Sequence, residues 1–199
     1  MRGHHILDAP AGARIASFTV QELLGTGASG VVYRAARGDE VVALKLQRLE
    51  GQAERESALL SRLKHRNVVG FRGCGPCPAS EPRWFFLAME YVHGRTLKQW
   101  VEQENPGARR AAELLRGMAR GLEAAHAARV LHRDVKECNV VVREEDGEAV
   151  LVDFGAGQEL GAPAPASGVL LPATQRYRSP EARAFHRDGG CPYVPSPAD

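Results

Sequence analysis

The 199-residue sequence has no long uninterrupted apolar run, so no membrane-spanning helix is expected in it. Its first residues also lack the apolar core of a secretory signal, which makes the cytoplasm the expected location. An excess of one charge is missing too, because 26 basic and 24 acidic side chains leave a net charge of +2. That balance gives no electrostatic reason to expect nucleic acid or an anionic membrane as a partner.

Cysteine is scarce, with four residues in the chain, and two of them form the Cys74-Gly75-Pro76-Cys77 segment. Two thiols at this spacing can act in redox chemistry when they cap a helix. Here prolines follow, so the segment is interpreted as a loop with two thiols in a turn. Zinc would need two more ligands at suitable spacing, and none stands nearby.

The first ninety residues predict an antiparallel sheet that carries one helix. The β-rich runs are Phe18–Leu24, Val31–Tyr33, Val41–Leu44, Val68–Val69 and Trp84–Met89, the last two joined by the cysteine loop. Between them, residues 52–64 have helical spacing. The apolar side of that helix would consist of Ala53, Leu59, Leu60 and Leu63.

The second half of the chain predicts a long amphipathic helix over residues 108–128. We expect Leu115, Met118, Leu122 and Ala125 to face a core, because they recur every three or four residues. Short strands are expected at 140–142 and 150–152, joined by a turn at Asp146-Gly147. From Gly155 onward, glycine, proline and alanine predict a long loop.

A glycine-rich motif stands between the first two predicted strands. Residues 25–32 fit the pattern G-x-G-x-x-G-x-V, in which backbone N–H groups can approach phosphate oxygens closely. A dinucleotide-binding fold would need this motif to begin a helix, whereas the Val31-Val32-Tyr33 run continues as a strand. The motif therefore favours a phosphate-covering loop between strands.

A lysine, Lys45, ends the apolar strand Val41–Leu44. That placement is unusual unless the ammonium meets an anion, although a lysine that reaches solvent is the ordinary alternative. Glu56 on the following helix could pair with it, and Glu54 is the competing candidate. Such a pair could direct the ammonium toward the phosphates of a nucleotide.

The strongest signal is the run His132-Arg133-Asp134-Val135-Lys136-Glu137-Cys138-Asn139, followed by Asp153-Phe154-Gly155 after an apolar strand. Phosphoryl transfer needs a proton acceptor at the attacking hydroxyl and metal ligands at the phosphates. Asp134 is the candidate base, and Asn139 and Asp153 are the candidate ligands for Mg²⁺ or Mn²⁺.

In order and spacing, these motifs and Ser179-Pro180-Glu181 resemble the protein kinase family from about Phe18 to Glu181. The resemblance implies an α+β, two-lobed kinase fold: an N-terminal extension (1–17), an N-lobe (18–89), a hinge (90–95) and a partial C-lobe (96–199). It selects Glu56 over Glu54. It also implies ATP as the cofactor and a protein as the phosphate acceptor, in the style of bacterial kinases of eukaryotic type.

The same resemblance assigns roles to single residues. The nucleotide would contact Gly25, Thr26, Gly27, Gly30, Lys45, Val32, Ala43, Leu24, Met89, Glu90 and Val92. Lys136 is similar to the lysine of the Ser/Thr class and would assist catalysis with Asp134, Lys45 and Glu56. Arg133 beside the base implies control by a phosphorylated activation loop, where Ser167 and Thr174 are the candidate sites of autophosphorylation. The resemblance offers a second role for Thr174, as the family's threonine that contacts the catalytic aspartate.

The sequence departs from the family at Glu137, where proline is usual, and after Glu181, which only eighteen residues follow. We therefore expect a C-terminally truncated domain whose helix 108–128 lacks a partner. If three or four large apolar side chains of this helix stay exposed to water, the domain loses stability on the order of 5 kcal/mol. Two alternatives follow: an inactive, nucleotide-binding pseudokinase fragment, and a small-molecule kinase such as an aminoglycoside phosphotransferase. The Pro180-Glu181 segment favours a protein acceptor over the latter.

Overall fold

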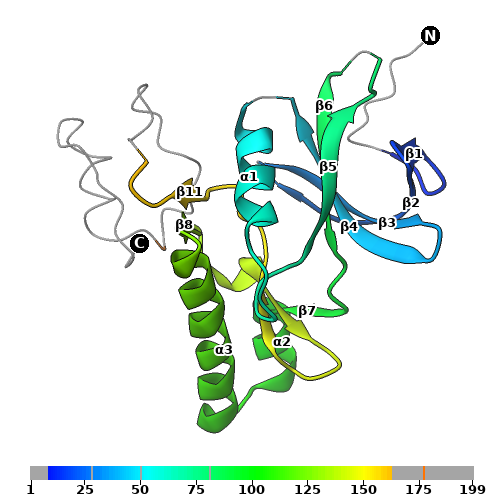
Figure 1. Cartoon of the computed structure of the whole chain (residues 1–199). Coiled ribbons are helices and arrows are strands. Elements are labelled where there is room, and N and C mark those ends of the chain that lie inside the picture. Colours follow the sequence, from blue (N-terminus) through cyan, green and yellow to red (C-terminus); the bar gives the residue numbers. More distant parts are fainter. Residues whose placement is uncertain (1–8, 28, 50, 81, 163–176, 178–199) are drawn as a thin grey trace. The chain divides into compact units, whose positions relative to one another are not determined.

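The computed structural model describes residues 9–162, except 28, 50 and 81, and also Tyr177. These residues belong to two compact units. Unit 1 comprises the described residues up to Ser61 together with Gly70–Val92. Unit 2 comprises Arg62–Val69 and the described residues from His93 onward. Each unit is described by itself, and Figure 1 labels the elements.

Unit 1 is built on a six-stranded antiparallel sheet in the order β1-β2-β3-β4-β6-β5. Its strands are β1 (Arg14–Ile15), β2 (Phe18–Gly27), β3 (Gly30–Arg37), β4 (Glu40–Arg48), β5 (Phe71–Cys77) and β6 (Trp84–Glu90). The runs expected at the start of the chain are therefore strands, and each is longer than its apolar core. Residues 14–15, expected to be part of an extension, pair with β2, and Ile15 is buried in the core.

The two faces of this sheet have different neighbours. Alternate residues of β3 and β4, among them Tyr33, Leu44 and Leu46, are fully buried in an apolar cluster with Phe18. Helix α1 (Gly51–Ser61) contacts β5 and β6 and buries Ala53, Leu59 and Leu60, three of the four residues expected on its apolar side (Figure 1). The fourth, Leu63, is also buried but lies beyond the end of the helix.

The cysteine segment is not the expected loop. It forms β5, in which Cys74 is exposed and Cys77 is buried, and the connection to β6 follows it. In an extended strand, residues three apart lie about 10 Å from each other, beyond the roughly 7 Å that a disulfide spans between Cα atoms. Both thiols are free, and the strand geometry argues against a redox pair. Val68, expected in a strand, makes only an isolated bridge to Leu151 in unit 2.

Unit 2 combines two main helices with short strands. Its elements are β7 (Gly94–Thr96), α2 (Leu97–Glu104), α3 (Ala108–Ala127), β8 (Val130–Leu131), the 3₁₀ turn Glu137–Asn139, β9 (Val140–Arg143), β10 (Ala149–Leu151) and β11 (Gln158–Glu159). The sequence did not predict α2, although Thr96 and Gln99 cap it reciprocally. In the described part of the chain, no helix has both the length and the apolar character needed to cross a bilayer. The expected α+β class is confirmed.

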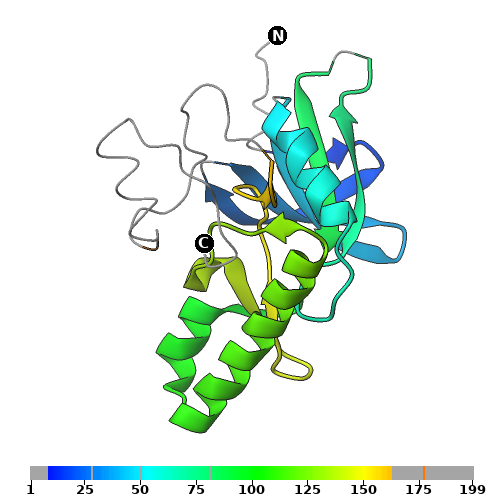
Figure 2. The same ribbon diagram turned by 60° about the vertical axis from the view of Figure 1, so that its left-hand side comes forward.

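Helix α3 has almost the expected bounds, but the predicted core face was wrong in part. Leu115 is 61% exposed, and the buried residues are Leu114, Gly117, Gly121 and Ala125. The two glycines carry no apolar signal in the sequence, yet their lack of a side chain lets the helix lie against Asn67 and Ala149. Figure 2 shows α3 beside the β9–β10 hairpin.

Candidate active site

In unit 1, Lys45 and Glu56 form a buried ion pair. The Nζ atom of Lys45 donates to Oε1 of Glu56 at 2.8 Å and to Oε2 at 2.9 Å. The lysine side chain is 3% exposed and the glutamate side chain 0%. Glu54, the alternative partner, is exposed. A buried charge is retained at this depth only when it is paired, so the two side chains hold each other in position.

The register of the sheet places the nucleotide candidates of β3, β4 and β6 on one face. Val32 is opposite Lys45 across β3 and β4, and Ala43 is opposite Met89 across β4 and β6. Lys45 and Ala43 are two residues apart, so all four side chains share the face that carries α1. Val32 and Ala43 are half-buried there, whereas the opposite face is filled by the apolar core. An apolar, partly open surface next to the ammonium of Lys45 is suited to a nucleotide base.

The glycines of the 25–30 motif differ in whether the protein's own packing requires them. Gly30 has φ = +130°, and a Cβ atom there would lie 2.3 Å from the carbonyl oxygen of Leu46, so the fold itself requires glycine. At Gly25 and Gly27 a Cβ atom would meet no protein atom within 4 Å. The protein's own packing therefore does not require these two glycines. Together with Thr26 they line open space at the end of β2, where a phosphate could approach the backbone.

At the end of β6, the backbone of Glu90 is already engaged. Its N–H group donates to the carbonyl oxygen of Gly70 at 2.7 Å, and its carboxylate Oε2 accepts from the Gly70 N–H at 3.2 Å. The N–H group of Glu90 is therefore already used inside unit 1, although the sequence suggested that it would meet an adenine edge. Val92 follows the strand and is half-buried.

In unit 2, the carboxylate of Asp134 accepts hydrogen bonds from residues of its own loop. Lys136 Nζ donates to Asp134 Oδ2 at 2.7 Å, and Asn139 Nδ2 donates to the same oxygen at 3.0 Å. The Asn139 amide also donates to the Asp134 carbonyl at 2.9 Å, which closes the loop on itself. Asp134 is 9% exposed, so the sequence brings a cation, an amide and a nearly buried carboxylate together within six residues.

A backbone hydrogen bond holds the segment that contains Asp153 next to this loop. The N–H group of Val152 donates to the carbonyl oxygen of Asn139 at 2.9 Å, which fixes the chain next to the catalytic-loop candidates. Asp153 itself has φ = +61°, and its Oδ1 accepts from the Gly155 N–H at 3.4 Å. A non-glycine residue in the left-handed region stores strain that is common at functional sites.

His132 connects the two segments, a role that the sequence analysis did not assign. Its Nε2 lies 3.0 Å from the Val152 carbonyl oxygen, and its ring packs against Phe154 with centroids 4.5 Å apart. Complete burial lowers the pKa of the His132 imidazole, against the opposing effect of the Val152 carbonyl and the neighbouring aspartates. The sequence signal was the presence of His132 and Phe154 in their motifs, which does not reveal that they touch.

The expected control residues are described only in part. Arg133 has φ = +64°, and its Nη1 donates to Oε1 of Gln158 on β11 at 2.5 Å. Glu137, at the position where the family has proline, accepts a hydrogen bond from the Tyr177 hydroxyl at 2.5 Å. Ser167 and Thr174 lie outside the described residues.

The donor atoms available to a divalent cation suit a hard metal. With its amide nitrogen directed at Asp134, Asn139 presents its amide oxygen as a ligand, and Asp153 provides a carboxylate. Among the described residues, no three His, Cys, Asp or Glu side chains cluster as a complete metal cage. Mg²⁺ commonly takes one or two protein oxygens and completes its shell with phosphates and water, so these two residues fit it.

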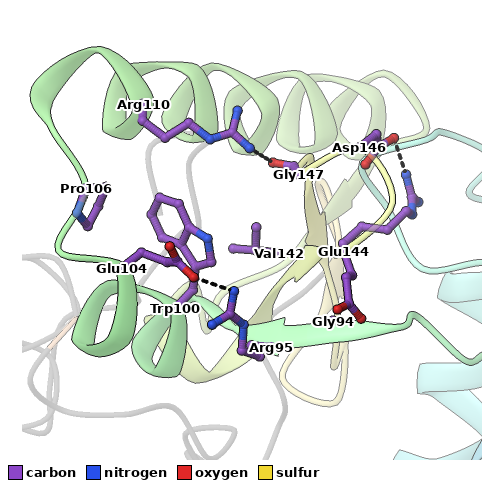
Figure 3. A pocket seen from close by; sticks show the side chains of 11 residues that line it. Gly94, Arg95, Trp100, Glu104, Pro106, Arg110, Val142, Glu144, Asp146 and Gly147 are labelled. Atoms are coloured by element: carbon purple, nitrogen blue, oxygen red, sulfur yellow. Dashed lines mark hydrogen bonds and ion pairs between the residues drawn. The ribbon is translucent and has the colours of Figure 1, made fainter.

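A hollow of about 510 Å³ lies elsewhere on unit 2, between α2, the start of α3 and the β9–β10 hairpin. Figure 3 shows the Trp100 indole between Arg110 of α3 and Arg95, and Arg95 is paired with Glu104. None of the catalytic or nucleotide candidates lines this hollow. It is therefore a separate feature of the surface.

The sheet with its lysine–glutamate pair, and the loop that holds an aspartate, a lysine and an asparagine together, are the features on which the sequence resembled the protein kinase family. Residues 18–189 match the family described as "Protein kinase domain", and the chain belongs to that family.

Among curated proteins, the chain is similar to three bacterial kinases. Serine/threonine-protein kinase PknD of Mycobacterium tuberculosis is 32% identical over 181 residues, which cover 85% of this chain and 26% of that protein. Serine/threonine-protein kinase PknL of the same species is 33% identical over 175 residues, 82% of this chain and 43% of the relative. Probable serine/threonine-protein kinase PknB of Lactococcus lactis is 29% identical over 170 residues, 79% of this chain and 26% of the relative.

These relatives confirm the expected resemblance to bacterial Ser/Thr kinases. The chain spans less than half the length of each of the three, because its matches cover 26%, 43% and 26% of them.

Proposed function

We propose that this chain is a protein serine/threonine kinase domain that transfers the γ-phosphate of ATP to a Ser or Thr hydroxyl of a protein. The observation that carries the proposal is the Asp134 carboxylate, which is held within hydrogen-bond distance of both Lys136 and Asn139. A base, a cation and a metal-ligating amide in one short loop are the groups that phosphoryl transfer needs from a protein.

In this proposal, Asp134 accepts the proton of the substrate hydroxyl. The hydroxyl oxygen forms a bond to the γ-phosphorus, the bond from that phosphorus to the bridging oxygen breaks, and ADP leaves. Lys136 lies next to the reacting groups and offsets the negative charge that spreads over the transferred phosphoryl group. The hydrogen bonds that Asn139 donates to the Asp134 carboxylate and carbonyl oxygens hold the proposed base in a fixed orientation.

Unit 1 would bind the nucleotide. Lys45 contacts the α- and β-phosphates, and Glu56 keeps the ammonium in place. Gly25, Thr26, Gly27 and Gly30 provide the backbone next to the phosphates. Residues of the shared sheet face and of the following segment contact the base: Val32, Ala43, Met89, Glu90 and Val92.

Asn139 and Asp153 would hold Mg²⁺ or Mn²⁺. When bound, such an ion neutralises phosphate charge and orients the γ-phosphate for in-line attack. The contribution of the chain is to fix both ligands: Asn139 through its bonds to Asp134, and Asp153 through the Val152–Asn139 backbone bond.

Two observations support a Ser or Thr hydroxyl of a protein as the phosphate acceptor. Lys136 is at the position typical of Ser/Thr kinases, and the relatives PknD and PknL are serine/threonine-protein kinases by name. We further propose autophosphorylation at Ser167 or Thr174, both of which lie in the long loop expected after Gly155. ATP and protein acceptors meet in the cytoplasm, where we propose that the domain acts.

The experiment is transfer from labelled ATP to a generic basic protein in the presence of Mg²⁺. We expect Asp134→Asn to lower the rate by at least roughly 100-fold, because the proton acceptor is lost. The matched control is Asp39→Asn in an exposed turn of unit 1, which should keep the wild-type rate. Unchanged transfer by Asp134→Asn would remove the base assignment. A wild-type chain that binds ATP but transfers nothing would instead be a pseudokinase.

A further inference from the structure

A buried glutamine, Gln47, is part of the lysine–glutamate cluster of unit 1. It lies two residues after Lys45 on β4, so both side chains point to the same face of the sheet. Its Nε2 atom donates to Oε2 of Glu56 at 3.2 Å, and the residue is only 6% exposed. The carboxylate of Glu56 therefore accepts hydrogen bonds from an amide as well as from the ammonium of Lys45.

The two donors differ in what else they can bind. The ammonium of Lys45 is the group proposed to meet phosphate oxygens, and its interaction with Glu56 must be shared once a polyanion is bound. The amide of Gln47 is neutral and remains a donor whatever binds to Lys45. Hydrogen bonds to a buried charge are among the strongest side-chain interactions, so this amide can hold Glu56 in place by itself for part of the reaction cycle.

The backbone on both sides fixes where the Gln47 amide can reach. On β6, Phe85 is its paired residue. On the other side, Gly30 comes so close that a Cβ atom there would lie 3.1 Å from the Gln47 Cβ and 2.3 Å from the Leu46 carbonyl oxygen. Gln47 thus lies beside the last glycine of the 25–30 motif and reaches helix α1 through its hydrogen bond to Glu56.

We infer that Gln47 is a positioning residue that holds α1 in the conformation in which Glu56 pairs with Lys45. This inference rests on the proposed function, in which Lys45 orients the nucleotide phosphates. It adds that the pair is preorganised by a third side chain of unit 1, which neither touches the substrate nor takes part in proton transfer.

The test uses the whole chain and compares Gln47→Met with Gln47→Glu. Methionine keeps the length and the burial of the side chain but removes the donor, and glutamate keeps the shape but places a second carboxylate next to Glu56. The control is Gln21→Met on β2, whose side chain is exposed on the same sheet. Hydrogen exchange of the backbone amides in Gly51–Ser61 reports the opening of α1 without any need for catalysis.

We expect Gln47→Met to accelerate exchange in α1 roughly tenfold and to lower kcat by a similar factor, since a hydrogen bond to a charged group is worth about that much. Gln47→Glu should have the larger effect, and Gln21→Met should have none. The decisive measurement is Gln47→Met in a Glu56→Ala background. There we expect the exchange rate of α1 and kcat to change by less than about twofold, because the acceptor of the Gln47 hydrogen bond is gone.

The inference is overturned if Gln47→Met changes neither exchange nor kcat, or if it changes both by the same factor when Glu56 is already alanine. The latter result would make Gln47 a packing residue only. Should the wild-type chain transfer no phosphate, the proposed function fails, and the exchange measurements still decide the role of Gln47. A Gln47→Glu variant that does not fold leaves the decision to Gln47→Met.

Discussion

Replacing Gly121 by alanine tests the packing of α3 against the segment that precedes β5. A Cβ atom at Gly121 would lie 2.6 Å from the Asn67 carbonyl oxygen and 2.9 Å from Leu151 Cδ1. The Asn67 carbonyl cannot move aside easily, because it accepts the Leu151 N–H at 2.9 Å. Since real Cβ atoms do not approach an oxygen this closely, α3 would have to shift away from the β9–β10 hairpin.

Gly117, one turn earlier on the same face, is a matched comparison. A Cβ atom there would lie 3.1 Å from Glu148 Oε2 and 3.2 Å from Asn67 Nδ2, which are both ends of side chains. Alanine in a helix interior is favoured over glycine by about 1 kcal/mol, whereas overpacking a core costs typically 1–3 kcal/mol. The clash at Gly121 is with a backbone oxygen, so its cost lies near the upper end of that range, about 3 kcal/mol, and the helix gain of about 1 kcal/mol leaves Gly121→Ala less stable by about 2 kcal/mol. Gly117→Ala should be neutral or gain up to about 1 kcal/mol.

Urea unfolding followed by far-ultraviolet circular dichroism measures both variants against the wild type. The urea midpoint of Gly121→Ala should be lower than that of Gly117→Ala, and the two unfolding free energies should differ by at least about 1 kcal/mol. Equal stability of the two variants, or a more stable Gly121→Ala, would refute the close approach of α3 to Asn67.

Three further predictions concern the candidate site and its surroundings. Glu56→Gln should lower phosphate transfer by at least roughly tenfold because it weakens the buried pair with Lys45, whereas Glu54→Gln on the exposed side of α1 should leave the rate unchanged; equal rates for the two variants would contradict the pairing. Burial lowers the pKa of the His132 imidazole, so as the pH falls the imidazole is protonated in the unfolded chain before it is protonated in the folded one. The free energy of unfolding should therefore decrease as the pH falls below about 6.5, which denaturant titrations at several pH values measure. A His132→Gln variant with the same dependence of unfolding free energy on pH would disprove this assignment. Peptide mapping after mild oxidation should find no disulfide between residues 74 and 77, because both lie on the extended strand β5; such a disulfide in the active chain would contradict the strand.

Much of the local structure could be predicted because it depends on neighbouring residues. The β-rich run Val31-Val32-Tyr33 predicted a strand, and the helical period of residues 108–128 predicted α3 to within one residue at its end. The chemistry of the loop around Asp134 was visible for the same reason: the carboxylate, the ammonium and the amide lie within six residues, so short-range geometry alone brings them together.

The wrong predictions share a physical cause, which is that contacts distant in the chain outweighed the local pattern. Cys74 and Cys77 have turn-forming neighbours, yet pairing with β6 extends them into a strand. Leu115 fits the apolar period of α3 but is exposed, because Gly117 and Gly121 allow the closest approach to Asn67. Glycine has no apolar side chain to count, so a periodicity analysis cannot recognise it as a contact residue.

By itself, then, the sequence determined which chemical groups the protein has, their order, and the family to which it belongs. Spacing alone left Glu54 and Glu56 both open, and only the family resemblance favoured Glu56. The tertiary structure supplied the physical reason, because the packing of α1 on the sheet buries the side of the helix that carries Glu56 and leaves Glu54 exposed. The same packing brought Gln47 to Glu56 and placed His132 against Phe154. Spacing along the chain shows which residues are available, and burial between elements shows which of them meet.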